Sequence, residues 1–310
     1  MKLRPLLALS IVLLAVPPLL AADSIPGISP GEVKKLHGDF QFTEGPATDR
    51  EGNLYFSDIP ANKIFHVDPT GKLSVFLEPS NHTNGLMLNA AGDLYACEMD
   101  GRIVRIDTKT KKVTAVAPEY NGKRFNAPND LVLDKAGGVY FTDPHFRAPM
   151  PLPQEKRSVY YAAADGKVTR IVEDLPAPNG VILSPDEKTL YVIPSLSAEM
   201  RAYPVEAPGK LGEGKVFCTL AQPEGAKNPG GGDGLTIDEK GNLYITSALG
   251  LQVFSSAGKA LGVIKFPEQP SNATFGGPDN DTLYVTARTS VYTCKVAVKG
   301  HRFTGKEAKE

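Results

Sequence analysis

The 310-residue sequence has no tryptophan, only three cysteines and almost no net charge, with 34 lysines and arginines against 35 aspartates and glutamates. Cys97, Cys218 and Cys294 are far apart and form no C-x-x-C pair, so at most one disulfide can form and buried free thiols are the default expectation. Zinc fingers and disulfide scaffolds are thereby excluded. Because the chain lacks a basic excess and any long Lys/Arg run, we expect no nucleic-acid partner.

Long hydrophobic runs are also missing after the first 22 residues. At the N-terminus, Lys2 and Arg4 precede an apolar run from Leu6 to Val16, two prolines and the pair Ala21-Ala22, which is the layout of a secretory signal peptide. We expect residues 1–22 to be removed and the mature chain to be periplasmic or secreted, with no insertion in the membrane. A membrane anchor is the competing interpretation, but the uninterrupted run is shorter than the roughly 20 residues of a spanning helix.

Glycine and proline are abundant, with 30 and 26 residues, and 41% of the chain is hydrophobic. This composition excludes a disordered chain and favours many short elements joined by turns. A phrase that combines a turn with a tyrosine-containing apolar run recurs six times, for example in residues 49–58 (DREGNLYFSD) and 134–143 (DKAGGVYFTD). The tyrosines of the six copies are Tyr55, Tyr95, Tyr140, Tyr191, Tyr244 and Tyr284.

The intervals between these tyrosines are 40, 45, 51, 53 and 40 residues, which is the range of propeller blades. Alternating runs and glycine-containing turns around each phrase indicate four strands per unit. The sequence therefore predicts an all-β fold, a six-bladed β-propeller of four-stranded blades, with residues 23–310 as a single domain. Because the last unit is one strand short, we expect an N-terminal strand within Val33 to Phe40 to complete it and close the ring.

A second regularity lies 11 or 12 residues before each tyrosine, where every unit carries a carboxylate or an amide. These residues are Glu44, Asn84, Asn129, Asn179, Asp233 and Asn272. Each begins the strand nearest the axis, so their common phase predicts six oxygen-bearing side chains on one rim of the central channel. Asn-Gly and Asp-Gly are also ordinary turn dipeptides, but turns explain neither the common phase nor Glu44.

Oxygen donors without imidazole or thiolate suit a hard divalent cation. We expect Ca²⁺, which accepts about 6 to 8 oxygens, whereas Mg²⁺ usually retains more water. Zn²⁺ is the least suitable of the three, because none of the five histidines has the spacing of a zinc site. The predicted ring is therefore a candidate calcium site.

Short segments on separate predicted units carry a further signal, and they occur in the order 42–46 (FTEGP), 124–131 (RFNAPNDL), 178–180 (PNG) and 232–235 (GDGL). Together they closely resemble the SMP-30/gluconolactonase family, and the resemblance extends from about Phe42 to Arg288. It implies a six-bladed propeller that binds a divalent metal, usually calcium, and a lactone-hydrolysing activity in the bacterial gluconolactonase-like branch.

The resemblance also implies roles for single residues. Glu44, Asn179 and Asp233 match the family's metal ligands, and Asn129 matches an asparagine that contacts metal or substrate. Asp233 also matches the aspartate proposed as catalytic base, which would deprotonate or orient the attacking water. In that mechanism the metal polarises the lactone carbonyl and stabilises the oxyanion.

Substrate contacts are less constrained by the sequence. Asn84 and His145 are candidates for substrate binding, with a surface or packing role as the alternative for His145. Where some sugar-lactone members of the family carry arginine, this chain has Ala127, and Arg124 or Arg147 could take that place.

Three functions follow from these observations. The first is a metal-dependent lactonase that hydrolyses a gluconolactone-like sugar lactone, its small-molecule partner, to the open acid. The second is a phosphotriesterase-like or other lactone hydrolase on the same metal site, because C=O and P=O are activated by similar ligands. The third is a non-catalytic binding propeller in which calcium is structural.

Overall fold

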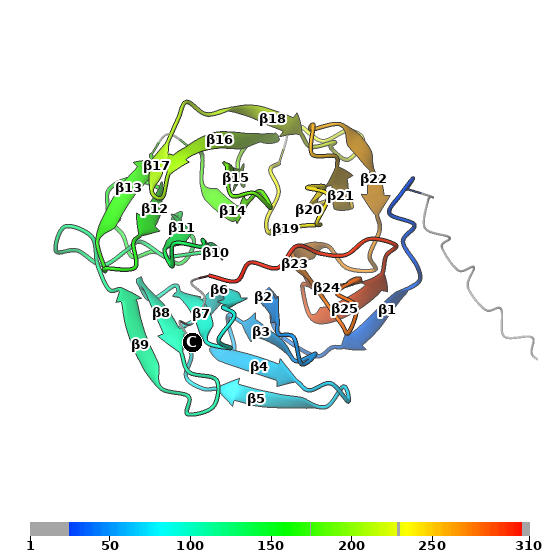
Figure 1. Cartoon of the computed structure of the whole chain (residues 1–310), viewed down its shortest axis with the longest axis horizontal. Helices are drawn as coiled ribbons and strands as arrows, with labels where there is room; N and C mark the ends of the chain where they lie inside the picture. Colours follow the sequence, from blue (N-terminus) through cyan, green and yellow to red (C-terminus); the bar gives the residue numbers. More distant parts are fainter. Residues whose placement is uncertain (1–24, 174, 228–229, 306–310) are drawn as a thin grey trace, which may run out of the picture.

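The computed structural model describes residues 25–173, 175–227 and 230–305, which contain 25 β-strands and no helix. The strands form six antiparallel sheets arranged radially around a central channel (Figure 1). The predicted six-bladed propeller is thus confirmed, while the predicted signal peptide, residues 1–22, lies outside the described residues. No helix of the described part is long and apolar enough to span a membrane.

The blades follow one another along the chain, each starting with its innermost strand. Blade 1 contains β2 (Thr43–Thr48), β3 (Leu54–Asp58), β4 (Lys63–Val67) and β5 (Leu73–Leu77). Blade 2 contains β6 (Thr83–Leu88), β7 (Leu94–Glu98), β8 (Arg102–Ile106) and β9 (Val113–Ala117). Blade 3 contains β10 (Leu131–Leu133), β11 (Val139–Asp143), β12 (Ser158–Ala162) and β13 (Val168–Val172).

The other three blades depart slightly from this pattern. Blade 4 contains β14 (Pro178–Leu183), β15 (Thr189–Pro194), β16 (Glu199–Ala207) and β18 (Lys215–Thr219), plus a short additional strand, β17 (Lys210–Leu211), on the extended end of β16. Blade 5 contains β19 (Leu235–Ile237), β20 (Leu243–Ser247), β21 (Gly250–Phe254) and β22 (Ala260–Ile264). Blade 6 contains β23 (Pro270–Gly276), β24 (Thr282–Ala287), β25 (Ser290–Lys295) and β1 (Val33–His37).

The N-terminal strand β1 closes the ring, as the sequence predicts. It pairs antiparallel with β25, with Val33 opposite Cys294 and Lys35 opposite Tyr292. The strand ends at His37, and Phe40 instead packs in the hydrophobic cluster that contains Phe56. The first described strand and the last blade are therefore held together by backbone hydrogen bonds, and β1 forms the outer edge of blade 6.

The repeated phrase of the sequence is the hairpin between the first and second strand of a blade. In blades 1, 2, 3 and 5 its first residue is an aspartate or asparagine whose side chain accepts a hydrogen bond from the N–H four residues later. The distances are 2.8 Å from Asn53 N to Asp49 Oδ1 and 2.7 Å from Gly138 N to Asp134 Oδ1. The glycine of the phrase has a positive φ, +91° at Gly52, which a side chain would oppose. Local turn chemistry therefore explains the recurrence of the phrase in these four blades.

Hydrophobic side chains fill the layers between neighbouring blades. The largest cluster joins blades 3 to 5 and includes Tyr140, Val192 and Ile245. The cysteines lie in these layers as buried, unpaired thiols, which confirms the expectation from the sequence; they are Cys97, Cys218 and Cys294. The blades are thus held by packing and hydrogen bonds rather than by disulfides.

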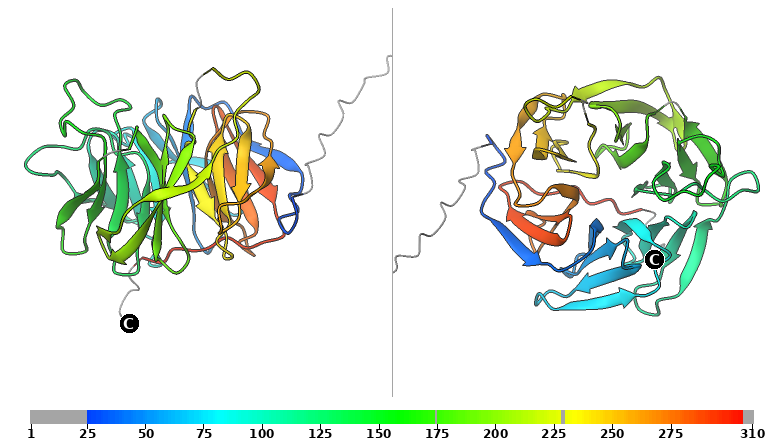
Figure 2. Two further views of the ribbon diagram at one scale, coloured as in Figure 1. Left: turned by 90° about the horizontal axis from the view of Figure 1, so that it is seen from above. Right: turned by 180° about the vertical axis from the view of Figure 1, so that it is seen from behind.

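The C-terminal segment after β25 crosses one face of the propeller and joins four blades (Figures 1 and 2). From blade 6, His301 N donates to Ile237 O of blade 5 at 3.0 Å. Arg302 then donates to Asp49 O at 3.2 Å, and Thr304 O accepts from Ala90 N of blade 2 at 2.8 Å. The long connection between β11 and β12 projects from the opposite face (Figure 2). The segment therefore covers one end of the channel only.

Glu268 lies between β22 and β23 and clamps the hairpin of β24 and β25. Its carboxylate accepts hydrogen bonds from Thr289 N at 2.9 Å, Thr289 Oγ1 at 2.8 Å and Tyr292 Oη at 2.7 Å, and a further one from the Ser290 hydroxyl. Burial by itself raises the pKa of Glu268, but these donors outweigh it and lower the pKa to about 2. The clamp is therefore ionised at neutral pH.

We expect Glu268→Gln to lower the free energy of unfolding by about 1 kcal/mol at neutral pH, a value reduced by solvent screening at this partly exposed site. Because the folded-state pKa lies below the ordinary value, the carboxylate stabilises the fold fully above about pH 4.5 and loses this contribution as the pH falls towards about 2. Urea unfolding near pH 7 and near pH 3 measures the effect. A difference between wild type and variant that is equal at both pH values would contradict an ionised clamp.

Candidate functional site

The innermost strands bend at the residues that the sequence singles out. In β6 the register with β7 shifts across Asn84-Gly85, in β14 it shifts across Asn179-Gly180, and in β2 it shifts directly after Glu44. A bulge turns the side chain beside it away from the regular alternation of the strand. The Asn-Gly pairs are therefore bulges that turn these side chains into the channel, not turns.

A cavity of about 470 Å³ lies at this end of the channel. Five of the six predicted ring residues line it together: Glu44, Asn84, Asn129, Asn179 and Asp233. Apolar side chains, among them Phe42, Ile59, Met99 and Phe146, line the rest of its wall. The common phase thus brings five oxygen-bearing side chains from five blades to one cavity.

The sixth predicted ring residue, Asn272, does not line this cavity, so the prediction of six on one rim is wrong. In blade 6 the register shift lies before Asn272, between it and Pro270, whereas in blades 1, 2 and 4 it follows the ring residue. Asn272 consequently lies deeper in the channel, where its side chain contacts the carboxylates of Glu44 and Asp130. It lines the cavity at the opposite end.

Asp130 is a third buried carboxylate of the channel that the sequence analysis did not assign. Its Oδ1 accepts a hydrogen bond from Leu131 N at 2.9 Å, and it lines the cavity at the opposite end of the channel. Burial is the main cause that raises the pKa of Asp130 to about 7, partly offset by its hydrogen bonds. A signal was present in the sequence, because four other units carry glycine at this position after the ring residue.

Glu44 and Asp233 carry the negative charge of the cavity. Burial, and then repulsion by Asp233, raise the pKa of Glu44, although Gly45 N donates to its Oε2 at 2.9 Å. Burial also raises the pKa of Asp233 to about 6, opposed by the hydrogen bond from Asn179 and the positive charge of Arg288. Two carboxylates in one apolar-walled cavity repel each other unless a cation lies between them.

Asn179 fixes the orientation of Asp233. Its Nδ2 donates to Asp233 Oδ1 at 2.6 Å and to Ser195 Oγ at 2.9 Å, which leaves the amide oxygen available to a cation or a substrate. No hydrogen bond from a described residue occupies the other carboxylate oxygen, Asp233 Oδ2. The pair therefore presents two oxygens from neighbouring blades to the cavity.

Hydroxyl groups of the second strands fix the ring residues of the neighbouring blades. Ser57 Oγ donates to Asn84 O at 2.9 Å, and Thr142 Oγ1 donates to Asn179 O at 2.6 Å. Both hydroxyl residues stand two positions after the tyrosine of the repeated phrase. The spacing of the ring residues around the channel is therefore set by hydrogen bonds between adjacent blades.

Two further carboxylates anchor the loops that enter the first strands. Asp58 accepts hydrogen bonds from the backbone N–H groups of Gln41 and Phe42, at 2.9 and 3.1 Å. Asp143 does the same for Asn126 and Ala127 at 2.9 and 2.8 Å. Both carboxylates are buried and end the repeated phrase of their blade. They hold the segments that precede Glu44 and Asn129 and thereby support the site indirectly.

The remaining predicted contact residues are placed differently. His145 does not line the cavity; its ring packs on that of Phe146, with 4.8 Å between ring centres, so its role in substrate binding stays a prediction. Arg124 donates to the carbonyls of Met99, Phe125 and Asn126 and so supports backbone. Arg147 lines the cavity, so of these two arginines it is the one that can reach a substrate.

The residues of the cavity fit a divalent cation. Asn84 is 3% exposed, and its Oδ1 is buried without a hydrogen-bond partner in the described structure, although such an atom is normally paired. The carboxylates of Glu44 and Asp233 and the amide oxygens of Asn84, Asn129 and Asn179 form an all-oxygen donor set. Among the described residues, no three His, Cys, Asp or Glu side chains form a metal-binding group.

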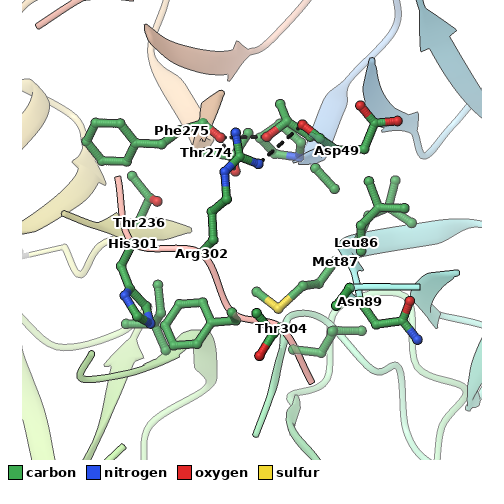
Figure 3. Close-up of a pocket in the computed structure, with 18 of the residues that line it drawn as sticks. Asp49, Leu86, Met87, Asn89, Thr236, Thr274, Phe275, His301, Arg302 and Thr304 are labelled. Atoms are coloured by element: carbon green, nitrogen blue, oxygen red, sulfur yellow. Dashed lines mark hydrogen bonds between the residues drawn. The ribbon is translucent and has the colours of Figure 1, made fainter. Parts of the chain in front are cut away.

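The opposite end of the channel holds a second, smaller cavity of about 170 Å³. The C-terminal segment crosses it, and Arg302 points from that segment towards Asp49 (Figure 3). Because this segment covers it, a substrate would approach the ring residues from the end that Arg147 lines.

The fold and this site define a six-bladed propeller with an oxygen-lined, acidic cavity at one end of its channel. Residues 42–289 match the model of the SMP-30/gluconolactonase/LRE-like region, and the chain belongs to this family. Over 294 residues it is 32% identical to the gluconolactonase of Zymomonas mobilis, an alignment that covers 86% of this chain and 82% of that protein.

Solved structures show the same architecture. A gluconolactonase from Xanthomonas campestris is similar with a TM-score of 0.79 and 29% identity, covering 91% of this chain and 95% of that one. A calcium-binding protein, regucalcin, from Agrobacterium tumefaciens has a TM-score of 0.74 at 23% identity, covering 88% and 97%, which shows the shared fold.

Proposed function

We propose that the protein is a lactonase, and more narrowly a divalent-metal-dependent enzyme that hydrolyses a sugar lactone to its open acid. The observation that carries the proposal is the cavity in which Glu44, Asp233 and three asparagines converge, with an unpaired oxygen on Asn84. The gluconolactonases similar to this chain cover most of its length and supply the reaction class. Calcium is the proposed cation because all the available donors are oxygens.

Glu44, Asn129, Asn179 and Asp233 would hold the cation, with Asn84 facing the same space. When bound, such an ion stabilises the negative charge that develops on the carbonyl oxygen. Asn84 and Asn129 can orient the lactone through their amides, while the apolar wall excludes bulk water.

Asp233 is the residue placed to handle the attacking water. Asn179 holds one of its oxygens at 2.6 Å, so the other can accept the proton of a water molecule in the cavity. The water oxygen bonds to the carbonyl carbon, the ring C–O bond breaks, and the proton passes to the leaving alkoxide, which becomes the hydroxyl of the open acid. Each step stays within reach of one carboxylate.

Removal of metal tests the proposal most directly. With D-glucono-1,5-lactone as substrate, we expect acid release above the spontaneous rate to fall at least about 100-fold after chelation and to return on addition of Ca²⁺. The thermal midpoint should also fall on chelation, because an ion that binds only the folded state stabilises it. Turnover that persists without metal would contradict the mechanism. Activity on phosphotriesters but not on lactones would favour the phosphotriesterase-like function. No turnover of either lactones or phosphotriesters would favour a binding propeller.

We also propose that the chain is exported after removal of residues 1–22. The charged and apolar pattern of this segment supports the proposal. Mass spectrometry of the mature protein from a fractionated culture tests it, and a chain that keeps its N-terminus in the cytoplasmic fraction would contradict it.

A further inference from the structure

Arg288 lies at the edge of the candidate active site, in the turn between β24 and β25. Its guanidinium stacks on Phe42, 5.5 Å from the ring centre, and its Nη2 donates to Gln269 Oε1 at 2.8 Å. Both of these partners line the cavity. Arg288 is exposed, and no acidic side chain of the described residues forms an ion pair with it. Its charge is therefore available at the mouth of the cavity.

The backbone at Arg288 is held in an unfavourable conformation. Its φ is +48°, in the left-handed region that glycine adopts more easily than a residue with a side chain. The turn is held because Arg288 O accepts hydrogen bonds from Thr43 N at 2.8 Å and from Thr43 Oγ1 at 3.3 Å, and because Glu268 clamps Thr289. Such local strain is often found at functional sites, where the side chain has a use.

Arg147, on the other side of the cavity mouth, also has a positive φ and no ion pair in the described structure. It follows β11 of blade 3, whereas Arg288 follows β24 of blade 6, so the two stand three blades apart in a ring of six and flank the mouth from opposite sides. Arg147 also has a positive φ, +61°, and it lines the cavity without an ion pair in the described structure. Two arginines without an ion pair in the described structure therefore lie on opposite sides of the entrance.

With a divalent cation bound, the charge balance at the mouth of the cavity would be positive. Glu44 and Asp233 are the acidic side chains among the described residues that line it, and a divalent cation neutralises this pair. Asp130 lies behind them at the far cavity, and its single charge is outnumbered by Arg147 and Arg288. A neutral sugar lactone would leave both guanidinium groups without an ion-pair partner among the described residues.

We propose that Arg288 and Arg147 recognise a negatively charged group of the substrate, so that the preferred substrate is a lactone that carries a carboxylate or a phosphate. The proposal rests on the lactonase function and narrows its substrate class. A guanidinium forms paired, charge-assisted hydrogen bonds with either group, which gives both affinity and orientation. The aromatic face of Phe42 and the amide of Gln269 hold Arg288 ready for this contact.

A matched pair of substrates tests the inference. D-glucono-1,4-lactone and D-glucaro-1,4-lactone share a ring and differ in one end group, which is neutral in the first and a carboxylate in the second. We expect kcat/KM to be higher for the glucarolactone and to fall about 10- to 100-fold in Arg288→Gln, through KM, with a change below about threefold for the gluconolactone. A parallel arm with 6-phospho-D-glucono-1,5-lactone and D-glucono-1,5-lactone shows whether phosphate serves as well as carboxylate.

Three variants separate recognition from folding. Arg288→Gly removes the side chain but suits the positive φ, so it should fold normally and show the same selective loss. Arg288→Lys keeps the charge without the planar fork and should restore part of the preference. Arg50→Gln removes an exposed arginine at the opposite end of the channel and should leave both substrates unaffected.

The outcomes distinguish this inference from the proposed function. The preference for the anionic lactone should also decrease with added NaCl in the wild type and lose this dependence in Arg288→Gln, because charges at an exposed mouth are screened. Equal losses on charged and neutral lactones, or no loss in Arg288→Gly, would overturn the substrate assignment while the lactonase function stands. Absence of turnover on every lactone would instead overturn the function on which it rests.

Discussion

Asp233→Asn is expected to lower kcat for lactone hydrolysis by about 10²- to 10⁴-fold, the range that a positioned proton acceptor contributes. The amide has nearly the same shape, but it cannot accept the proton of the attacking water and it binds a cation less tightly. Stopped-flow measurement of acid release with a pH indicator gives kcat, and calorimetric titration with Ca²⁺ gives the affinity. We expect both to decrease.

The same substitution should leave the fold intact, which separates chemistry from stability. Without metal, Asp233→Asn removes the repulsion between Asp233 and Glu44, so its thermal midpoint should equal or exceed that of the wild type. Asp165→Asn, in an exposed hairpin turn, is the matched control and should keep full activity. Wild-type turnover in Asp233→Asn would remove Asp233 from the mechanism.

The sequence predicts the fold well because its information is local and repeated. Each repeated phrase is one hairpin, so the period of the phrases directly gives the number of blades. In four of the six blades the hairpin is closed by an aspartate or asparagine side chain and a glycine with positive φ. Closure by Val33–His37 follows because the last unit lacks a strand. β17 is not predictable in this way, since it pairs only with the extended end of β16 and belongs to no repeat.

The site is predicted less completely, because phase along a strand does not determine the position of a bulge. Glu44, Asn84 and Asn179 reach the cavity through register shifts at or after them, whereas the shift before Asn272 moves that residue deeper into the channel. Spacing counted from the tyrosines is the same in both situations. The third channel carboxylate, Asp130, is not predicted by the repeat, because it stands where four other units carry glycine.

The repeats in the sequence do not predict which residues lie at the mouth of the cavity. Arg288 contacts Phe42 and Gln269, and the three come together only because the ring closes blade 6 against blade 1. His145 is not placed by the repeats either: its ring packs beside Phe146, and its role in substrate binding stays a prediction. Loop contacts of this kind depend on the closed ring and are set by no local pattern.

Gly45, directly after the ring residue Glu44, is under a severe steric constraint, and its substitution should strongly lower stability. A Cβ at Gly45 would lie 2.1 Å from the carbonyl oxygen of Asn84, a backbone atom of the next blade that cannot move alone. Its φ of +48° adds strain for any other residue. We expect Gly45→Ala to lower the free energy of unfolding by about 3 kcal/mol or more, by urea unfolding.

Gly92→Ala is the control that isolates the clash. Gly92 also has a positive φ, +85°, but nothing lies within 4 Å of a Cβ there, so its substitution should cost only about 1 kcal/mol. Because Asn84 O also accepts from Ser57 at 2.9 Å, separation of the blades by Gly45→Ala displaces two ring residues together, and Ca²⁺ affinity should fall with stability. Equal losses in both variants would show that backbone strain, not the approach of blade 1 to blade 2, makes glycine necessary beside Glu44.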